Sequence, residues 1–214
     1  NYDTPQVIQG LRIYPQSING VNVKYLNQDS ALVSVTDMVV GGSWPMLISF
    51  CPVKTKAIRL NMAAYSGTPS IYEMEVLFQE PIEASSEYSA GYATDKVIDG
   101  IIGDFANRWS ASGSGDAWIQ FNYDTPQMIE GLWVYPQSIG TVDVEYLNNE
   151  CELEAVTSLA VDGSWPMLIS FCPVETKSIR LNMTAYGGTP SIYEMGVLFQ
   201  EPIEASSEYS AGYA

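Results

Sequence analysis

The chain contains a second copy of itself at an offset of 121 residues. When residues 1–93 are laid over residues 122–214 without a gap, 23 positions differ, so 70 of 93 agree. A regular period of this length predicts an array of whole domains rather than a solenoid of small units. Repetition on this scale favours multivalent binding or the building of a fibre over catalysis.

The two ends of the chain suggest where the repeats begin. The counterpart of residues 94–121 occurs only once. We therefore expect a partial first repeat at residues 1–82 that lacks its front, a complete repeat at 83–202, and the start of a third repeat at 203–214. This arrangement predicts that the sequence is one part of a longer array of repeats. The alternative is that the ends of the chain were chosen without regard to the repeats, which would produce the same pattern. A period of about 120 residues is long enough for one domain with its own core.

The complete repeat has the pattern of short strands. Residues 117–123 and 142–146 alternate between apolar and other side chains, as strands do when one face is buried. Asp124-Thr125-Pro126 predicts a turn between strands, because proline restricts the backbone and aspartate can bond to it. Further strands are expected at 131–135, 178–183 and 192–199. Strands at this spacing predict an all-β fold, an antiparallel β-sandwich.

The charge of the chain excludes several classes of partner. Nine basic residues against twenty-five acidic ones give a net charge of −16, which repels the phosphates of nucleic acids and anionic lipids. Membrane insertion is not expected either, because Glu145 and Glu175 replace lysines of the first repeat. The same charge is compatible with the binding of a cation.

Catalysis is poorly supported by the sequence. Histidine is absent, which removes the most common general base and the most common transition-metal ligand. No motif places a nucleophile, a base and an orienting group together. We therefore predict that the protein is not an enzyme. The alternative is a pair of catalytic carboxylates, because their separation is decided only in three dimensions.

The three cysteines leave two interpretations open. Cys51 and Cys172 are equivalent in the two repeats, whereas Cys151 matches Ser30. A Cys151–Cys172 disulfide could form within the second repeat, or all three thiols could be buried as small apolar groups. An Asn-Met-Thr sequon predicts a glycosylation site at Asn182.

Six segments of the complete repeat follow one another in an order typical of a known family. They are residues 84–88, 93–100, 107–110, 118–121, 177–181 and 188–195. Together they resemble discoidin domains, also called coagulation-factor 5/8 type C domains, which are close to family-32 carbohydrate-binding modules. The resemblance covers essentially the whole repeat. It implies a galactose-binding-like jelly roll that is non-catalytic and extracellular.

The resemblance also implies a calcium site. In the family, backbone carbonyls, an aspartate of an Asp-Gly turn and a glutamate of the last strand hold the ion. The matching residues are Asp99 and Glu194, with Asp104 or Asn107 in the intervening loop and the carbonyl oxygen of Lys96. Calcium prefers six to eight hard oxygen ligands, which carboxylates and turn carbonyls provide.

A structural role is the alternative for these carboxylates. Asp99 could cap a turn, and Glu194 could pair with Arg108 or Arg180. In the first repeat Glu73 matches Glu194, so a calcium site there needs a segment that precedes residue 1.

Carbohydrate binding is the other activity that the family suggests. Sugar sites combine an aromatic ring with a few polar groups. Trp44 and Trp165 lie in Gly-Ser-Trp-Pro turns, and Tyr65 and Tyr186 precede glycine-containing turns. These four residues are the candidates for contact with a sugar. Packing of the two tryptophans against the sandwich or a neighbouring repeat is the stronger expectation.

The joint between repeats is short. Residues 199–206 contain Pro202 and no Gly/Ser linker, so neighbouring copies of the repeat should stand head to tail in a fixed relation. We predict a secreted, calcium-stabilised tandem array that forms an extracellular filament or a cell-surface stalk. The alternative is an array of carbohydrate-binding modules, serving cell adhesion or appended to an enzyme, with glycans as partners.

Overall fold

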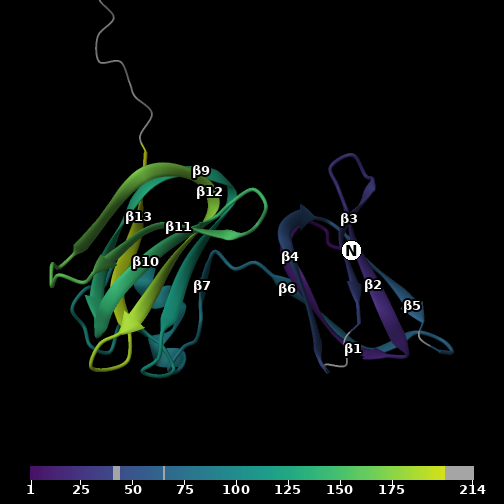
Figure 1. The fold of residues 1–214 in the computed structure, drawn as a ribbon, viewed down its shortest axis with the longest axis horizontal. Coiled ribbons are helices and arrows are strands. Elements are labelled where there is room, and N and C mark those ends of the chain that lie inside the picture. Colours follow the sequence, from purple (N-terminus) through teal and green to yellow (C-terminus); the bar gives the residue numbers. More distant parts are fainter. Residues whose placement is uncertain (41–43, 65, 201–214) are drawn as a thin grey trace, which may run out of the picture. The chain divides into compact units, whose positions relative to one another are not determined.

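The computed structural model describes residues 1–40, 44–64 and 66–200, which form two compact units (Figure 1). One unit comprises Asn1–Pro81 together with Asn149–Glu152, and the other comprises Ile82–Asn148 and the described residues from Leu153 to Gln200. The expected start of a third repeat at 203–214 lies outside the described residues. Within the described part of the chain, no helix has the length and apolar character needed to cross a membrane.

The second unit is a sandwich built from a single ordered set of antiparallel strands. Its strand order is β11-β10-β12-β9-β13-β8, and β7 pairs with β9. The strands are β7 (Ile82–Ala84), β8 (Trp109–Ser110), β9 (Ala117–Gln137), β10 (Ile139–Leu147), β11 (Leu153–Ala160), β12 (Met167–Ala185) and β13 (Ser191–Phe199). Two 3₁₀ helices, η1 (Ala90–Tyr92) and η2 (Thr94–Ile98), follow β7. The prediction of an all-β antiparallel sandwich is confirmed.

Strands β9 and β12 are long enough to take part in both layers of this sandwich (Figure 1). The prediction of a turn at Asp124-Thr125-Pro126 was wrong, because β9 continues through these residues. The strand pairing shows the reason. Asn122 of β9 pairs with Ser178 of β12, and Gln127 pairs with Thr176. Between these two pairs β9 has four residues, whereas β12 has one. This bulge bends the strand without ending it.

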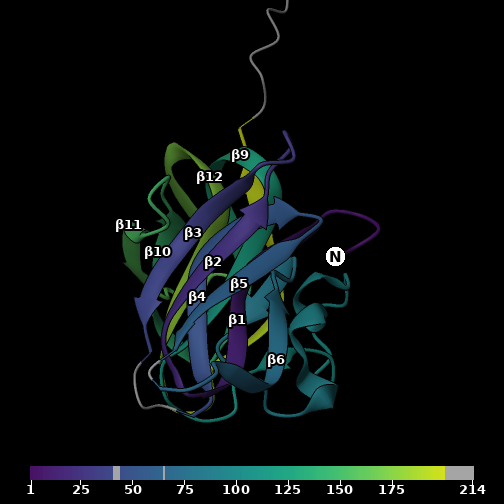
Figure 2. The ribbon, with the colours of Figure 1, turned by 90° about the vertical axis from the view of Figure 1, so that its right-hand side faces the viewer.

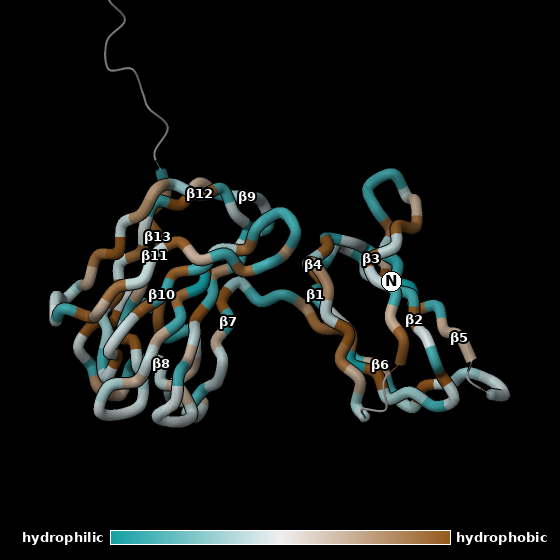
Figure 3. Tube along the Cα trace, in the orientation of Figure 1, coloured by the Kyte–Doolittle hydropathy of each residue, from teal (hydrophilic) through white to brown (hydrophobic). Residues whose placement is uncertain are grey.

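The core of the second unit follows the predicted alternation at 142–146, whereas at 117–123 the intervening Gln120 and Asn122 are buried as well and Tyr123 is only half-buried. Ala117, Ile119 and Phe121 are buried, as are Val142 and Val144. Figure 3 shows brown, hydrophobic positions along the strands, with turns that range from white to the teal of hydrophilic residues. Full burial of one such aliphatic side chain contributes about 1.5–3 kcal/mol, so this alternation is a main source of the stability of the sandwich.

The first unit contains two three-stranded sheets, ordered β4-β1-β6 and β3-β2-β5 (Figure 2). Its strands are β1 (Gln6–Gln16), β2 (Ile18–Leu26), β3 (Leu32–Val39), β4 (Met46–Thr55), β5 (Ile58–Ala64) and β6 (Ser70–Phe78). The bounds of β2, β3 and β6 recur in β10, β11 and β13 at the offset of 121 residues. The same residue pattern therefore produces the same strands in both units.

The cysteines pair in a way that the sequence did not suggest. Cys51 of β4 forms a disulfide with Cys151, with Cα atoms 5.7 Å apart, while Cys172 is a free, exposed thiol. Neither a Cys151–Cys172 bond nor three buried thiols is present.

Candidate functional site

A polar pocket of about 380 Å³ lies in the second unit where β8, β9 and β13 meet. Its lining consists of Tyr88, Tyr92, Arg108, Ser110, Gln137, Ser138, Thr189 and Ser191. Ser191, at the start of β13, is paired with both Ser110 of β8 and Gln137 of β9. The sheet therefore holds these three side chains in register. The loop before η1 and η1 itself add Tyr88 and Tyr92, and the loop before β8 adds the cationic Arg108.

Arg108 is surrounded by aromatic rings. The carbon atom at the centre of its guanidinium group lies 5.2 Å from the ring centroid of Tyr92, 5.3 Å from that of Phe105 and 5.9 Å from that of Tyr193. These distances are within the range of cation–π attraction. The guanidinium also donates a hydrogen bond to the carbonyl oxygen of Phe105. The position of the guanidinium group is therefore set by η1, by the loop after η2 and by β13, which carry these three rings.

Two buried polar atoms at the pocket have no hydrogen-bond partner among the described residues. They are Nε of Arg108, which is a donor, and Oε1 of Gln137, which is an acceptor. Leaving a buried donor or acceptor unpaired costs about 1–3 kcal/mol each. A hydroxyl group can accept from the first atom and donate to the second. Within the described chain, one donor and one acceptor among the lining residues of this pocket are therefore left without a partner.

Hydroxyl groups form the floor of the same pocket. Oγ of Ser110 and Oγ of Ser191 are 2.8 Å apart, and the Ser191 hydroxyl also donates to the carbonyl oxygen of Thr189 at 3.1 Å. The backbone N–H of Tyr88 donates to the carbonyl oxygen of Ser110 at 2.8 Å, which ties the loop after β7 to this floor. These bonds hold the polar groups in place before any ligand arrives.

Trp165 contacts the ring of Tyr193, which in turn lies beside the guanidinium group of Arg108. Its ring is 5.7 Å from that of Tyr193 and 5.4 Å from that of Tyr135, both in edge contacts. Trp165 therefore packs against the sandwich through these two rings, although more than half of it remains exposed. Because Tyr193 also faces Arg108, the loop tryptophan and the pocket share one aromatic neighbour.

The remaining aromatic candidates have different surroundings. Tyr186 is exposed, and its backbone N–H donates to the carbonyl oxygen of Ser138, which lines the pocket. Trp44 is exposed in the first unit and makes edge contacts with Tyr14 and Tyr72. Tyr65 lies outside the described residues. The structure therefore brings Trp165 and Tyr186 near the pocket, whereas Trp44 belongs to the other unit.

The predicted calcium ligands gather in the loop after η2. The amide of Asn107 donates to both carboxylate oxygens of Asp99, at 3.0 and 2.8 Å, and Nζ of Lys96 is 3.7 Å from Oδ2 of Asp99. Asp104 accepts a hydrogen bond from the backbone N–H of Ala106 at 2.9 Å. Asp99 also accepts the backbone N–H two residues on, which is the expected cap of a turn.

Glu194 is the most buried carboxylate of this group, at 6% exposure. It accepts the backbone N–H of Gly100 at 3.0 Å, in place of the expected alternative of a pair with Arg108 or Arg180. Burial raises the pKa of Glu194, the bond from Gly100 lowers it, and the charge of Asp99 raises it. Glu73, its equivalent in the first unit, is exposed.

The carboxylate and amide oxygens of this loop are the kind of ligand that a hard cation such as calcium prefers. Within the described ranges, however, no three acidic, cysteine or histidine side chains converge as a metal site. Lys96 already presents a positive charge to Asp99. Calcium binding therefore stays a prediction that depends on Asp99, Glu194 and backbone carbonyls.

The predicted glycosylation site lies inside a sheet. Asn182 of β12 is half-buried and is paired with Asp143 on one side and Trp118 on the other. The hydroxyl of Thr184, the third residue of the sequon, is 2.7 Å from that of Thr141. Glycosylation at Asn182 stays a prediction.

Sequence reasoning missed the polar part of the pocket. Arg108 and Tyr88 entered only through family segments, Arg108 also as an ion-pair partner, and Gln137 and Tyr92 were not considered. A signal was present, because the Asn-Arg-Trp-Ser segment that includes Arg108 was among the family motifs. The convergence of these residues depends on strand pairing, which the motif does not reveal.

The second unit is an antiparallel β-sandwich, and its sequence identifies the family. Residues 81–195 match the family model described as the F5/8 type C domain. Because this match covers more than half of the chain, the protein belongs to the F5/8 type C domain family. The resemblance to discoidin domains is confirmed. No curated protein matches the chain.

Several solved structures resemble this chain in fold. Chitosan-binding module 1 of a chitosanase/glucanase from Paenibacillus sp. IK-5 is 20% identical, with a TM-score of 0.47, over 55% of this chain and 92% of the module. The family 32 carbohydrate-binding module of Streptococcus pneumoniae EndoD is 13% identical, with a TM-score of 0.48, over 55% and 93%. A Ruminococcus gnavus GH29 fucosidase in complex with fucose is 17% identical, with a TM-score of 0.49, over 56% of this chain and 25% of the fucosidase. At these identities the likeness concerns the fold alone.

Proposed function

We propose that this protein is a non-catalytic carbohydrate-binding protein that holds a sugar in the pocket around Arg108. The observation that carries the proposal is the pair of buried, unpartnered atoms there, a donor on Arg108 and an acceptor on Gln137. A sugar hydroxyl can accept from the first atom or donate to the second. The proposal replaces the filament as the main interpretation, because membership of the family and the geometry of the pocket support binding more directly.

A binding role fits the chemistry of the pocket better than catalysis does. The lining, as far as the structure describes it, has one cation, one amide, hydroxyls and aromatic rings, and it includes no carboxylate. Hydrolysis of a glycosidic bond usually needs two carboxyl groups that flank the bond. The rings of Tyr88 and Tyr92, 5.7 Å apart, offer apolar surface for the face of a sugar.

An extracellular or cell-surface location is part of the same proposal. The Cys51–Cys151 disulfide supports it, because such bonds persist in oxidising compartments. The high negative charge disfavours nucleic acid as a partner. A glycan is therefore the partner that we expect the second unit to meet.

The test compares two equivalent glutamines. A glycan array identifies a ligand for the unaltered chain, and calorimetric titration then measures its affinity for Gln137→Ala and for Gln16→Ala, the matched change in the first unit. We expect affinity to fall at least about tenfold for Gln137→Ala, since a lost hydrogen bond in a buried site costs roughly 1.4 kcal/mol or more. Gln16→Ala should bind normally. Equal affinities for both variants, or no glycan bound by the chain, would contradict the proposal.

We also propose that calcium stabilises the loop after η2. Asp99 directly precedes Gly100, and the buried Glu194 accepts the backbone N–H of Gly100. A bound cation would neutralise both and draw on backbone carbonyls as further ligands. Calcium should then raise the melting temperature of the chain by mass action.

The two units provide a control for this second proposal. Glu194→Gln should remove the effect of calcium on melting, whereas Glu73→Gln, the equivalent exposed change, should preserve it. An identical melting temperature in calcium and in chelator for the unaltered chain would rule the site out.

The filament remains a separate proposal that rests on the internal repetition alone. Electron microscopy of the native material is its test. Continuous rods with a regular step would support head-to-tail stacking, and isolated beads would contradict it.

A further inference from the structure

One face of β9 carries aromatic side chains that lead toward the pocket. Leu132 and Val134 are buried in the core of the second unit, so the alternation of a strand places Trp133 and Tyr135 on its outer face. Gln137, which lines the pocket, follows on the same face by the same alternation. At about 3.3 Å per residue, Trp133 and Gln137 are about 13 Å apart along the strand.

Edge contacts connect these rings with others into one group, which we call the aromatic strip. Neighbouring ring centroids are 5.4 to 6.0 Å apart in the order Trp133, Tyr135, Trp165, Tyr193 and Phe105. Trp165 and Phe105 are more than half exposed, and Trp133 and Tyr135 are partly exposed. Contiguous exposed apolar surface of this kind is typical of binding sites.

The two repeats differ at one end of the strip. Trp133 of β9 lies between Leu168 of β12 and Gly196 of β13 in the paired strands. The first unit has the same leucine, but Arg12 and Glu75 fill the other two positions and form an ion pair at 2.6 Å. The two replacements belong together, because a Cβ on Gly196 would stand 2.5 Å from the indole ring. The second unit therefore has an aromatic surface where the first has paired charges.

The middle of the strip is common to both units. In the first unit the ring of Trp44 is 5.4 Å from that of Tyr14 and 6.1 Å from that of Tyr72, which are the positions of the three middle rings. Arg12 ends this shorter group with a charge. A ligand that needs the full length of the strip is therefore expected to bind the second unit.

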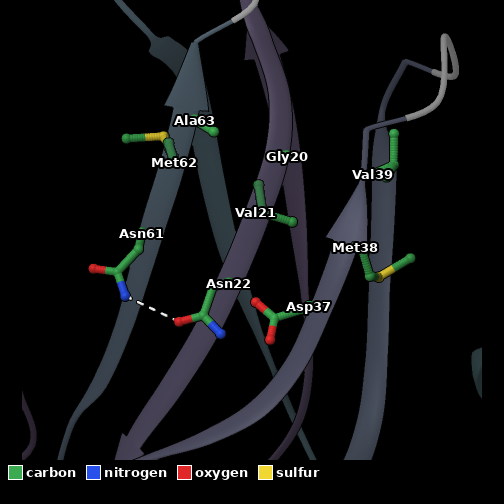
Figure 4. Close-up of a pocket in the computed structure, with 9 residues that line it drawn as sticks. All are labelled: Gly20, Val21, Asn22, Asp37, Met38, Val39, Asn61, Met62 and Ala63. Carbon is green, nitrogen blue, oxygen red and sulfur yellow. Dashed lines mark hydrogen bonds between the residues drawn. The ribbon is translucent and has the colours of Figure 1, made fainter.

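The hollow of the first unit does not form a comparable surface (Figure 4). It measures about 420 Å³ and is lined by three consecutive residues from each of β2, β3 and β5. Consecutive residues of a strand point to opposite faces of a sheet, so this lining belongs to no single face. Met62 in this hollow is 37% exposed, whereas Met183 at the same position of the second unit is 1% exposed. The hollow therefore offers no face on which a row of sugars can lie.

An uncharged glycan chain fits the strip better than a protein or a lipid does. Aromatic rings bind the apolar faces of sugars, and the spacing of the rings is close to the length of one sugar residue in an extended chain. The net charge of −16 repels a second copy of this chain, anionic lipids and polyanionic glycans. Tyr193 also lies 5.9 Å from the guanidinium group of Arg108, so the strip and the pocket are continuous.

We propose that the second unit binds an extended, uncharged, β-1,4-linked glycan, with one end in the pocket and the following sugars on the aromatic strip. The inference rests on the proposed function, because it takes the pocket as the first of several sugar positions. Trp133 then determines specificity for length, since only a chain of several sugars extends about 13 Å from Gln137. A β-1,4-linked chain is extended, whereas an α-1,4-linked chain coils away from a flat row of rings.

The experiment titrates the full chain with two uncharged β-1,4-linked series, the cello-oligosaccharides and the N-acetylated chito-oligosaccharides. In one of them the hexasaccharide should bind at least about tenfold more tightly than the disaccharide, as burial of further sugar faces against the rings requires. Maltohexaose, which is α-1,4-linked, should bind no more tightly than the disaccharide. Equal affinity for the disaccharide and the hexasaccharide in both series would overturn the inference.

A double exchange tests the role of Trp133 directly. Trp133→Arg combined with Gly196→Glu installs the ion pair that the first unit already accommodates. It should lower the affinity for the hexasaccharide at least about tenfold, and Arg12→Ala, at the equivalent position of the first unit, should not. Melting curves confirm that both variants are folded. Unchanged affinity in the double exchange would contradict the inference.

Two further outcomes separate this inference from the proposed function. If Gln137→Ala weakens the binding of a short glycan from the array but chain length has no effect, the pocket stands and the strip is refuted. If the chain binds no glycan, both proposals fail. A dimer in sedimentation that the double exchange dissociates would also overturn the inference, because a second copy would then cover the strip.

Discussion

We expect Gly196→Ala to destabilise the second unit, although alanine normally suits a strand better than glycine does. Gly196 of β13 is paired with Trp133 of β9, whose ring lies over it. A Cβ atom on Gly196 would stand 2.5 Å from Cε2 and Cζ2 of that ring. Carbon atoms normally approach to about 3.5–4.0 Å, so the indole must move by roughly 1 Å or more.

Two opposing effects determine the size of the change. Overpacking of this kind costs about 1–3 kcal/mol, and alanine in place of glycine returns about 0.5–1 kcal/mol of backbone entropy. The net loss is about 1 kcal/mol, which lowers the melting temperature of a domain of this size by roughly 4 °C. When Trp133→Ala is already present, the clash is gone and Gly196→Ala should stabilise by about 0.5 kcal/mol.

The assay is a double-mutant cycle by scanning calorimetry of the full chain. The reasoning requires a change of sign between the two backgrounds and a coupling of about 1.5 kcal/mol. If Gly196→Ala lowers the melting temperature equally with and without Trp133, the ring is not the cause. The first repeat shows the alternative combination, because Arg12 and Glu75 occupy these two positions and form an exposed ion pair at 2.6 Å.

Three further changes should have measurable effects. Gly131→Ala should cost about 1–3 kcal/mol in urea unfolding, because its Cβ would stand 2.6 Å from the backbone oxygen of Ile169. Cys151→Ser opens a disulfide that spans 100 residues and should destabilise the first unit by up to about 4 kcal/mol, read by the same method. Burial raises the pKa of Tyr123 to about 12, so its stabilising effect is complete below pH 10 and is lost between pH 10 and 12. Partial exposure limits that loss to about 1 kcal/mol, and Tyr123→Phe should abolish it in alkaline melting curves.

The strands were predictable because their signal is local. The alternation around Ile119 and Val144 specifies which face is buried whatever the neighbouring strand, so the sandwich followed from the sequence. The apparent turn at Asp124-Thr125-Pro126 misled for the same reason. Its residues favour a turn locally, but the pairing of β9 with β12 on both sides holds the strand together through a bulge.

The candidate site was only partly predictable. Trp165 and Tyr186 could be named because aromatic residues in glycine-rich turns are visible along the chain. Arg108 could be recognised as part of the site only from its contacts with Tyr92 and Tyr193. These two tyrosines are about a hundred positions apart in the sequence. No spacing rule connects such residues before the strands are paired.

The amino-acid sequence by itself determined the all-β character of the repeat, its period and its family, since these depend on patterns within short segments. Tertiary structure alone decided three other features: the pocket with its unpaired atoms, the choice of Cys51 rather than Cys172 as the partner of Cys151, and the exposure of Met62. Each of these depends on which strand lies beside which. Adjacency between strands is a property of the folded chain, and the same residues in the two repeats acquire different surroundings when a neighbouring strand is present or missing.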